Sequence, residues 1–194
     1  EFPQASLGQL IGNLANTFYA VKDVSYYDGA TAIEYYSQGW GAFTLSSFIN
    51  GKRGLYADPS NALFQHEYGH YLQSQASGPF YIQRYAIPSL IDAAGNSKHS
   101  SHATEQDANI RAYMYFMETI PNYNKWSEKN KKYINGMWDY NSNPISGYNW
   151  NLPYSNSVNE SVLKKGMLWF GWSDYVFGPS WLIPGLINIL ELKQ

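Results

Sequence analysis

The chain has 194 residues, a length that suits one globular domain over residues 1–194. It contains no cysteine, which excludes disulfides, thiolate metal sites and a cysteine nucleophile. With 13 Lys and Arg against 15 Asp and Glu, the net charge of −2 provides no strong field for nucleic acid or an anionic membrane. The sequence begins at Glu1 without a signal-peptide pattern, so we interpret it as a piece of a longer protein.

Hydrophobic spacing and turn signals predict the elements in the first half of the chain. These are a helix over 7–20, a turn at Asp28-Gly29, strands over 30–36 and 40–49, a turn over 51–54 and a helix that ends near Ala76. Asp58 is expected to be the N-cap of the second helix, with Pro59 at its first helical position. The pair Gly78-Pro79 is expected to follow its end.

The second half of the chain is expected to be helical at first and irregular later. It contains an apolar stretch over 81–92 broken by Pro88, a polar loop over 97–101, a helix over 104–119 and an irregular region over 123–154. Thr104 and Asp107 fit a capping box at the start of the 104–119 helix, with a start near Ser100 as the alternative. The apolar stretch 176–190 is too short and interrupted to span a bilayer, so we expect a buried or docking segment there.

The clearest chemical signal is the sequence HEYGH over residues 66–70. Four residues turn a helix by about 400°, so His66 and His70 lie one turn apart on the same side and can reach one metal ion. Glu67 points to a neighbouring direction, from which it can accept a proton from an attacking water. Two histidines with an adjacent glutamate are typical of zinc metallopeptidases. The alternative is an ordinary helix with two histidines, although the chain has only four.

A zinc hydrolase needs a third protein ligand and keeps a fourth position for water. We expect Glu105 to be that ligand, because Asn109 lies one helical turn further along and can steady a ligand imidazole from behind. Two alternatives stay open: Glu105 as an acid that stabilises a helix N-terminus, and His102 as the third ligand.

The developing negative charge on the substrate also needs a hydrogen-bond donor. The sequence offers Tyr68, Tyr81, Tyr85, His99, His102, Arg111 and Tyr113. The tyrosines are expected mainly to pack in the core. If His102 is not a ligand, His102 or His99 is the preferred donor.

Three stretches, over 39–50, 63–89 and 102–116, resemble a C-terminal domain of many bacterial rearrangement-hotspot (Rhs, YD-repeat) proteins. Those proteins are large and secreted or surface-exposed, and their variable C-terminal domains are often toxins. The resemblance implies a zinc metallopeptidase with His66, Glu67 and His70 in its site. Separately, EQDAN over 105–109 is similar to the Glu-x-x-Ala-Asp ligand motif of glutamate-type zincins (gluzincins), with Asn109 in place of Asp.

We therefore predict an α+β zincin-like domain with an active-site helix, a glutamate helix and a small sheet. One zinc ion is expected on His66, His70 and Glu105, with Glu67 as general base on a peptide or protein substrate. The strand over 40–49 is either a core strand or the edge that holds the substrate backbone. The alternatives are hydrolysis of another amide, such as cell-wall peptide, and a non-catalytic binding or delivery module with a structural or degenerate metal site.

The resemblance also implies a setting for this chemistry. It places the chain within a larger bacterial protein that is secreted or on the cell surface, with a toxin or effector role. An inhibitor or immunity protein is then an expected partner. Nucleic acid is not expected as a partner, and no segment of the sequence is expected to span a membrane.

Overall fold

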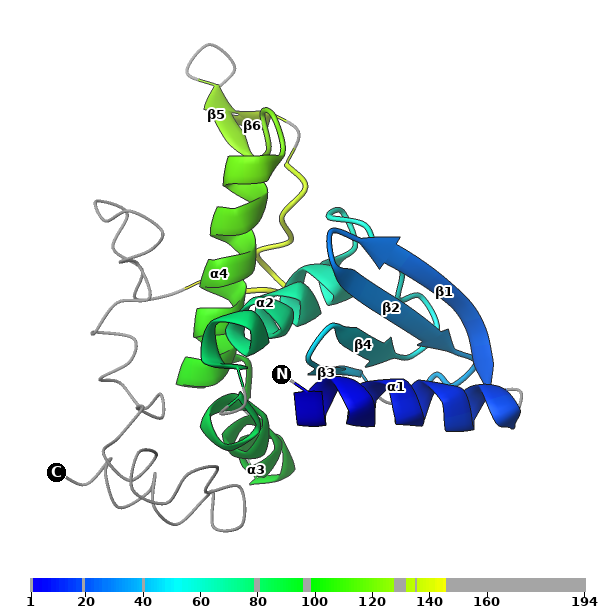
Figure 1. The fold of residues 1–194 in the computed structure, drawn as a ribbon. Coiled ribbons are helices and arrows are strands. Elements are labelled where there is room, and N and C mark those ends of the chain that lie inside the picture. The colour runs from blue at the N-terminus through cyan, green and yellow to red at the C-terminus, as the bar shows by residue number, and fades with distance from the viewer. Residues whose placement is uncertain are drawn as a thin grey trace, which may run out of the picture.

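The computed structural model describes residues 2–18, 20–39, 41–78, 81–95, 99–127, 132–134 and 136–145. In chain order its elements are α1 (Phe2–Thr17), β1 (Val21–Tyr27), β2 (Ala30–Tyr35), β3 (Ala42–Leu45), β4 (Phe48–Gly51), α2 (Ala62–Ser77), η2 (Ile82–Ala86), α3 (Ile87–Gly95), η3 (His99–Ser101), α4 (Ala103–Thr119), β5 (Lys125–Ser127) and β6 (Lys132–Ile134). In Figure 1, α2 and α4 cross at the centre, with the sheet and α1 to one side and α3 below. The predicted α+β class is confirmed. The expected apolar segment 176–190 lies outside the described residues.

The larger sheet has the strand order β1-β2-β4-β3, with β2 and β4 parallel and the other neighbours antiparallel. β1 and β2 form a hairpin around Asp28 and Gly29, whose φ angles of 34° and 84° suit the two-residue turn that Asp-Gly favours. This turn and the strand expected over 30–36 are confirmed. β1 has no counterpart among the strands expected from the sequence.

The single strand expected over 40–49 is wrong. The chain forms two strands there, β3 and β4, which pair antiparallel with each other. A tight turn with Ser46 at a φ of 56° separates them, and no Gly or Pro marks this turn in the sequence. Among the strands of the described residues, β3 pairs only with β4, so it forms one edge of the sheet.

α2 carries the histidine pair, and its start differs from the expected one. The N-cap is Asn61, whose side chain accepts a hydrogen bond from the Phe64 N–H (2.9 Å). Asp58 instead accepts from the Ser60 N–H (2.7 Å) in the turn ahead of the helix, so the expected cap at Asp58 is wrong. The end is as expected, with Gly78 at a φ of 55° as the C-cap.

Pro88 is expected from the sequence to break the apolar stretch over 81–92, but the structure shows helix on both sides of it. A π-helical turn, η2, runs directly into α3, and the Ile87 N–H donates to the carbonyl of Ile82. Pro88 is the second residue of α3. Proline has no N–H to donate within a helix, and the π turn just ahead of it shifts the hydrogen bonding from i→i−4 to i→i−5, so the helical path continues through Pro88. α3 then ends at Gly95, and His99 opens the short 3₁₀ turn η3.

α4 begins one residue earlier than expected, and its cap is His102. The backbone of His102 is extended, and its Nδ1 accepts from the Thr104 N–H (3.4 Å). The capping box of Thr104 and Asp107 is therefore wrong. Asp107 is buried and accepts from the side chains of Gln73 and Arg111 (2.8 and 2.7 Å).

Helices α2 and α4 approach closely because Gly69 lies at their contact. A Cβ added there would meet the carbonyl oxygen of Ala108 at 2.0 Å, so only glycine fits. Aromatic rings fill the space beside the contact, with Tyr68 and Phe116 stacked at 5.2 Å between ring centroids. Both rings are buried in the main hydrophobic core. This crossing brings the start of α4 to the middle of α2.

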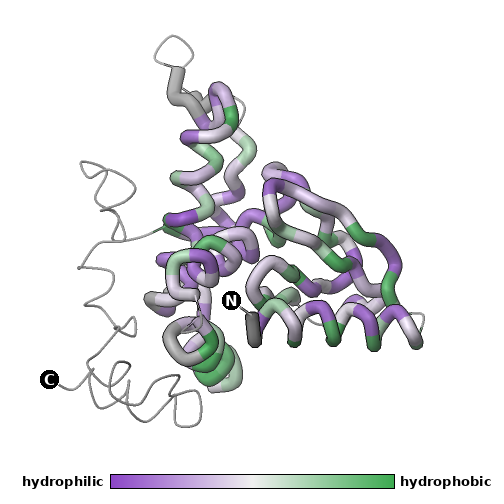
Figure 2. Tube along the Cα trace, in the orientation of Figure 1, coloured by the Kyte–Doolittle hydropathy of each residue, from purple (hydrophilic) through white to green (hydrophobic). Residues whose placement is uncertain are grey.

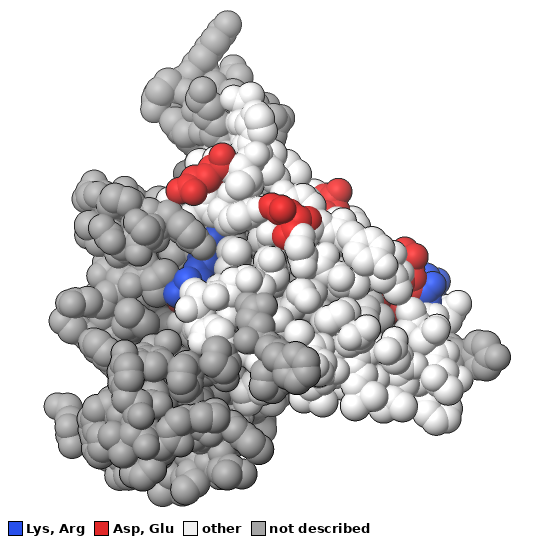
Figure 3. All heavy atoms as spheres, in the orientation of Figure 1, with Lys and Arg blue, Asp and Glu red and all other residues white. Residues whose placement is uncertain are grey.

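The region after α4 is less irregular than expected, because β5 and β6 pair as a short hairpin. Residues 136–145 have no helix or strand, as predicted, and those from 146 onward lie outside the described residues. None of the helices in the described ranges is long and apolar enough to cross a membrane. Figure 2 shows hydrophobic and hydrophilic residues alternating along α1, and the face in Figure 3 carries few charges on its described residues.

Candidate metal centre

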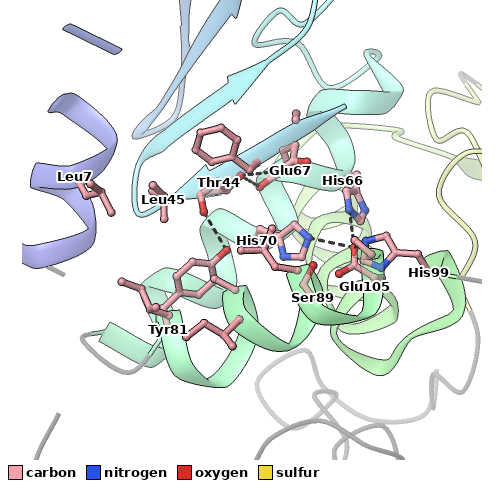
Figure 4. A pocket seen from close by; sticks show the side chains of 17 residues that line it. Leu7, Thr44, Leu45, His66, Glu67, His70, Tyr81, Ser89, His99 and Glu105 are labelled. Carbon is pink, nitrogen blue, oxygen red and sulfur yellow. Dashed lines mark hydrogen bonds and ion pairs between the residues drawn. The ribbon is translucent and has the colours of Figure 1, made fainter. Parts of the chain in front are cut away.

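The α2–α4 crossing brings His66, His70 and Glu105 together. The Oε2 atom of Glu105 lies 3.0 Å from His66 Nε2 and 3.3 Å from His70 Nε2. The two imidazole rings meet nearly perpendicular, at 4.8 Å between centroids. One potential ligand atom from each residue lies within 4.8 Å of the others. Figure 4 shows both imidazoles directed at the Glu105 carboxylate. The three residues predicted as ligands therefore lie together, with their potential ligand atoms facing one another.

The proton of His70 is fixed on the nitrogen that faces away from the cluster. Gln73 uses its Nε2 to donate to the Thr104 carbonyl and to Asp107 Oδ2, both at 2.8 Å. Its Oε1 therefore faces His70 Nδ1 at 2.8 Å and accepts from it. In neutral His70 the Nε2 atom then has a lone pair that points toward Glu105. Gln73, which is fully buried, is not among the site residues expected from the sequence.

Asn109 holds His66 in the same way, as its spacing from Glu105 predicts. Its Nδ2 donates to the Pro144 carbonyl (2.9 Å), which leaves Oδ1 to accept from His66 Nδ1 at 2.9 Å. The amide of Asn109 fills this position without the negative charge of the Asp in the gluzincin motif. In neutral His66 the Nε2 atom therefore also has a lone pair that points toward Glu105.

Three atoms that can only accept hydrogen bonds thus face one another when both imidazoles are neutral. Such a cluster requires a cation or added protons. Ligand atoms on a tetrahedral zinc ion, at bond lengths of about 2.0–2.1 Å, lie about 3.3–3.4 Å apart. The 3.0 and 3.3 Å distances from Glu105 Oε2 to the two imidazoles are close to this spacing. The three residues could therefore hold a metal ion, and the two distances from Glu105 are compatible with zinc.

The pKa shifts of His66, His70 and Glu105 also indicate that this cluster favours positive charge. Burial opposes protonation of His70, but the charge and hydrogen bond of Glu105 outweigh it and raise the pKa of His70 to about 9. The pKa of His66 is also raised, because Glu105 again outweighs burial. Burial would raise the pKa of Glu105, yet the two imidazoles hold it well below its ordinary range. A bound cation or protons on the histidines would compensate the charge of the Glu105 carboxylate.

Glu67 lies beside this cluster, and its carboxylate points toward β3. Thr44 Oγ1 donates to Glu67 Oε2 at 2.7 Å, and both residues are buried. Glu67 and Thr44 line the same cavity as the three clustered residues. The expected position of Glu67, adjacent to the ligands but separate from them, agrees with this geometry. The contribution of Thr44 is not predicted by the sequence.

His99 and His102 take different places. His102 caps α4, with its Nδ1 2.7 Å from Thr104 Oγ1, and it does not line the cavity. His99 does line it, and its Nε2 lies 3.6 Å from Glu105 Oε2. Asp92 holds the ring of His99 through Nδ1 at 2.9 Å. Of the two preferred donors, only His99 is in reach of the cluster.

The remaining candidate donors are corrected by the structure. Tyr113 lies eight residues, or about 12 Å of helix, beyond Glu105, and its ring packs against Trp138 in the core. Tyr68 and Tyr85 are buried in the two hydrophobic clusters. Arg111 pairs with Asp107 at 2.7 Å. None of these four lines the cavity among the described residues.

Tyr81 lines the cavity, unlike the other tyrosines in the candidate set. Its hydroxyl donates to the Thr44 carbonyl at 3.2 Å. Burial and the nearby carboxylates of Glu67 and Glu105 raise the pKa of Tyr81 well above its ordinary value. Tyr81 is therefore a neutral phenol that joins the η2 segment to β3.

No family model, curated protein or solved structure matches this chain. The resemblance to the Rhs-associated domain, and the toxin role, location and immunity protein that it implies, stay predictions.

Proposed function

We propose that this domain is a zinc-dependent metallopeptidase with a zincin-like site. The observation that carries the proposal is the convergence of three ligand atoms, from His66, His70 and Glu105, next to a separate carboxylate. Two histidines and one glutamate are the protein ligands of several zinc hydrolases. A zinc ion bound there would lower the pKa of a water molecule and polarise the carbonyl of a peptide bond.

Glu67 is the residue that we assign as general base. Thr44 fixes the carboxylate through Oε2, and Oε1 is the oxygen assigned to accept a proton. As water attacks the carbonyl carbon, one water proton moves to Glu67. The same proton then passes to the amide nitrogen as the C–N bond breaks, so the products are a carboxylic acid and an amine.

The edge strand β3 is suited to hold the backbone of an extended peptide. Gly41 accepts from Lys52 across the β3–β4 pair, whereas the Thr44 carbonyl accepts from Tyr81 on the other side. Because backbone groups alternate between the two sides of a strand, Ala42 and Thr44 direct theirs away from β4. Both residues line the cavity, so a peptide added at this edge would lie beside Glu67.

His99 is the residue that we assign to stabilise the developing oxyanion. Asp92 orients its ring, and its Nε2 is directed into the cavity near Glu105. In its doubly protonated form, Nε2 would donate to the oxygen of the attacked carbonyl. Loss of one such donor typically lowers kcat by about 10²–10³-fold.

A second role for His99, as a fourth metal ligand, would favour the non-catalytic alternative. At 3.6 Å from Glu105 Oε2, its Nε2 is near enough to become a fourth ligand, and four protein ligands are typical of structural zinc sites. The variant His99→Ala separates the two roles. Retained zinc with slower hydrolysis supports the donor, whereas zinc affinity lowered as much as in His66→Ala supports a closed structural site.

The proposal is tested by zinc content and peptide hydrolysis of Glu67→Gln beside the wild type. Glutamine keeps the shape of the side chain but cannot accept the proton, so the variant should bind zinc normally. Its hydrolysis rate should fall by about 10²–10⁴-fold. Glu118→Gln, an exposed change on α4, is the control. Equal hydrolysis by the wild type and Glu67→Gln would contradict the assigned mechanism.

A further inference from the structure

The cavity beside the cluster has a volume of about 560 Å³ and two unlike ends. Its polar side chains gather at the histidine end, and most of the remaining lining is aliphatic. The aliphatic lining comprises Leu7, Ala42, Leu45, Ile82, Ala86, Ile87, Leu90 and Ala93. Figure 4 shows Leu7 reaching from α1 toward Leu45, with Tyr81 and Thr44 between this apolar end and the histidines.

One wall of the apolar end comes from α1, which lies against the β3–β4 turn. A Cβ on Gly8 would lie 2.9 Å from the Leu45 carbonyl oxygen and 2.9 Å from Phe48 Cβ, so glycine permits this close approach. The buried side chain of Gln4 donates to the Gly78 carbonyl and ties α1 to the end of α2. These contacts fix the position of Leu7 at the cavity.

The opposite wall comes from α3. Ile87, Leu90 and Ala93 follow one another at intervals of three residues, so they share one face of the helix, and all three line the cavity. Leu90 is 64% exposed and Leu7 is 43% exposed. These two leucines thus present apolar surface to solvent on both sides of the cavity, where a ligand side chain can bury it.

We propose that this apolar end binds a large aliphatic or aromatic side chain next to the scissile bond, with Leu7 and Leu90 as the residues that set this preference. The inference rests on the proposed peptidase function, because the cavity is continuous with the Glu67 site. A charged side chain there would lose its hydration without a partner. α1 itself carries no charged residue between Phe2 and Thr17, and Figure 3 shows no charge colour along it.

The first test measures binding without cleavage, in zinc-loaded Glu67→Gln protein. The probes are capped five-residue glycine peptides whose central residue is leucine, phenylalanine, aspartate or glycine. Burial of one large apolar side chain should make the leucine and phenylalanine peptides bind about 10- to 100-fold more tightly than the glycine peptide. Equal affinities for the leucine and aspartate peptides would overturn the inference.

The second test assigns the preference to residues through two matched pairs. Leu7→Asn is compared with Leu14→Asn, two turns further along α1, where Leu14 is 51% exposed and outside the lining. Leu90→Asn is compared with Ile91→Asn, where Ile91 is 58% exposed and also outside it. Leu7→Asn and Leu90→Asn should each lose about 5- to 10-fold in affinity for the leucine peptide, and their controls should not. Equal losses in variant and control would overturn the assignment.

Failure of this inference is distinguishable from failure of the proposed function. If wild-type protein cleaves peptides without preferring large apolar residues beside the cut, only the inference is overturned. If wild type and Glu67→Gln cleave equally, the proposed function fails. The binding series then still decides whether the cavity prefers apolar side chains, because it does not depend on cleavage.

Discussion

The two ends of the cavity differ in what holds their side chains. At the histidine end, Gln73 and Asn109 are at most 1% exposed, and each uses its side-chain amide to orient one imidazole. At the other end, Leu7 and Leu90 are 43% and 64% exposed. The polar end is thus ordered by the protein alone, whereas the apolar end leaves surface that a ligand would cover. Substitutions at the polar end should therefore lower stability and metal affinity. Substitutions at the apolar end should mainly affect ligand binding.

The largest effect on stability is expected at the helix crossing that supports the polar end. Gly69→Ala would put a methyl group 2.0 Å from the Ala108 carbonyl oxygen, so α2 and α4 must separate. Overpacking of this kind costs about 3 kcal/mol, and the separation also moves Glu105 from the histidines. Gly39→Ala, where a Cβ meets nothing within 4 Å, is the control. Thermal unfolding of both variants tests this, and equal melting temperatures would contradict the close crossing.

A smaller effect is expected from the residue that orients His70. Gln73→Met keeps the approximate volume but removes the acceptor of the Nδ1 proton, and zinc affinity should fall about 10- to 100-fold. Gln75→Met, at an exposed position of the same helix, should leave the affinity unchanged. Titration of zinc against a competing chelator measures both. If the two variants bind zinc equally well, Gln73 does not order the metal centre.

A polar contact remote from the cavity provides a reference for the polar end. Burial raises the pKa of Glu34, but the Gly54 N–H and the Lys22 ammonium outweigh it and hold that pKa below 4.5. The stabilisation is complete above pH 4.5 and is lost as the pH falls through the lowered pKa of the folded state. Glu34→Gln should therefore cost about 1 kcal/mol at pH 7, less in more acidic buffer. Melting temperatures of the wild type and Glu34→Gln, measured from pH 7 to pH 3, test this. A difference between the two proteins that grows toward low pH would contradict it.

The smallest effect is expected on the exposed apolar surface. Leu10 is 52% exposed on α1, outside the cavity lining. Leu10→Ser should change the free energy of unfolding by no more than about 0.5 kcal/mol. Chemical denaturation measures this value. A loss of several kcal/mol would mean that the fold depends on the exposed leucines of α1. The exposed apolar surface would then contribute to stability, contrary to the contrast between the two ends of the cavity.

The sequence predicts the polar end well, because its residues follow from local spacing. His66 and His70 lie one helical turn apart, and Asn109 lies one turn beyond Glu105, so each helix positions its own pair. Gln73 and Thr44 are not predictable in this way, because their roles depend on which elements become neighbours. Neither the turn at Ser46 nor the π-helical turn before Pro88 carries a local signal, so the strand and helix boundaries there are not predicted.

The apolar end is harder to predict from sequence for a related reason. The spacing of Leu7 indicates an amphipathic helix but not which surface that helix covers. Its place at the cavity depends on the close contact of Gly8 with Leu45 and Phe48, which are distant in sequence. Similarly, the orientation of the His99 ring depends on Asp92, seven residues earlier, and on the path of the chain between them.

The central claim is that His66, His70 and Glu105 bind one zinc ion. Its most direct test is the zinc content of wild-type protein, Glu105→Ala and His102→Ala, measured side by side after equilibration with a competing chelator, with folding checked by circular dichroism. We predict one zinc per chain in the wild type and His102→Ala, and loss of zinc from folded Glu105→Ala. A wild type that takes up no zinc, or a Glu105→Ala variant that retains zinc while His102→Ala loses it, would contradict the account.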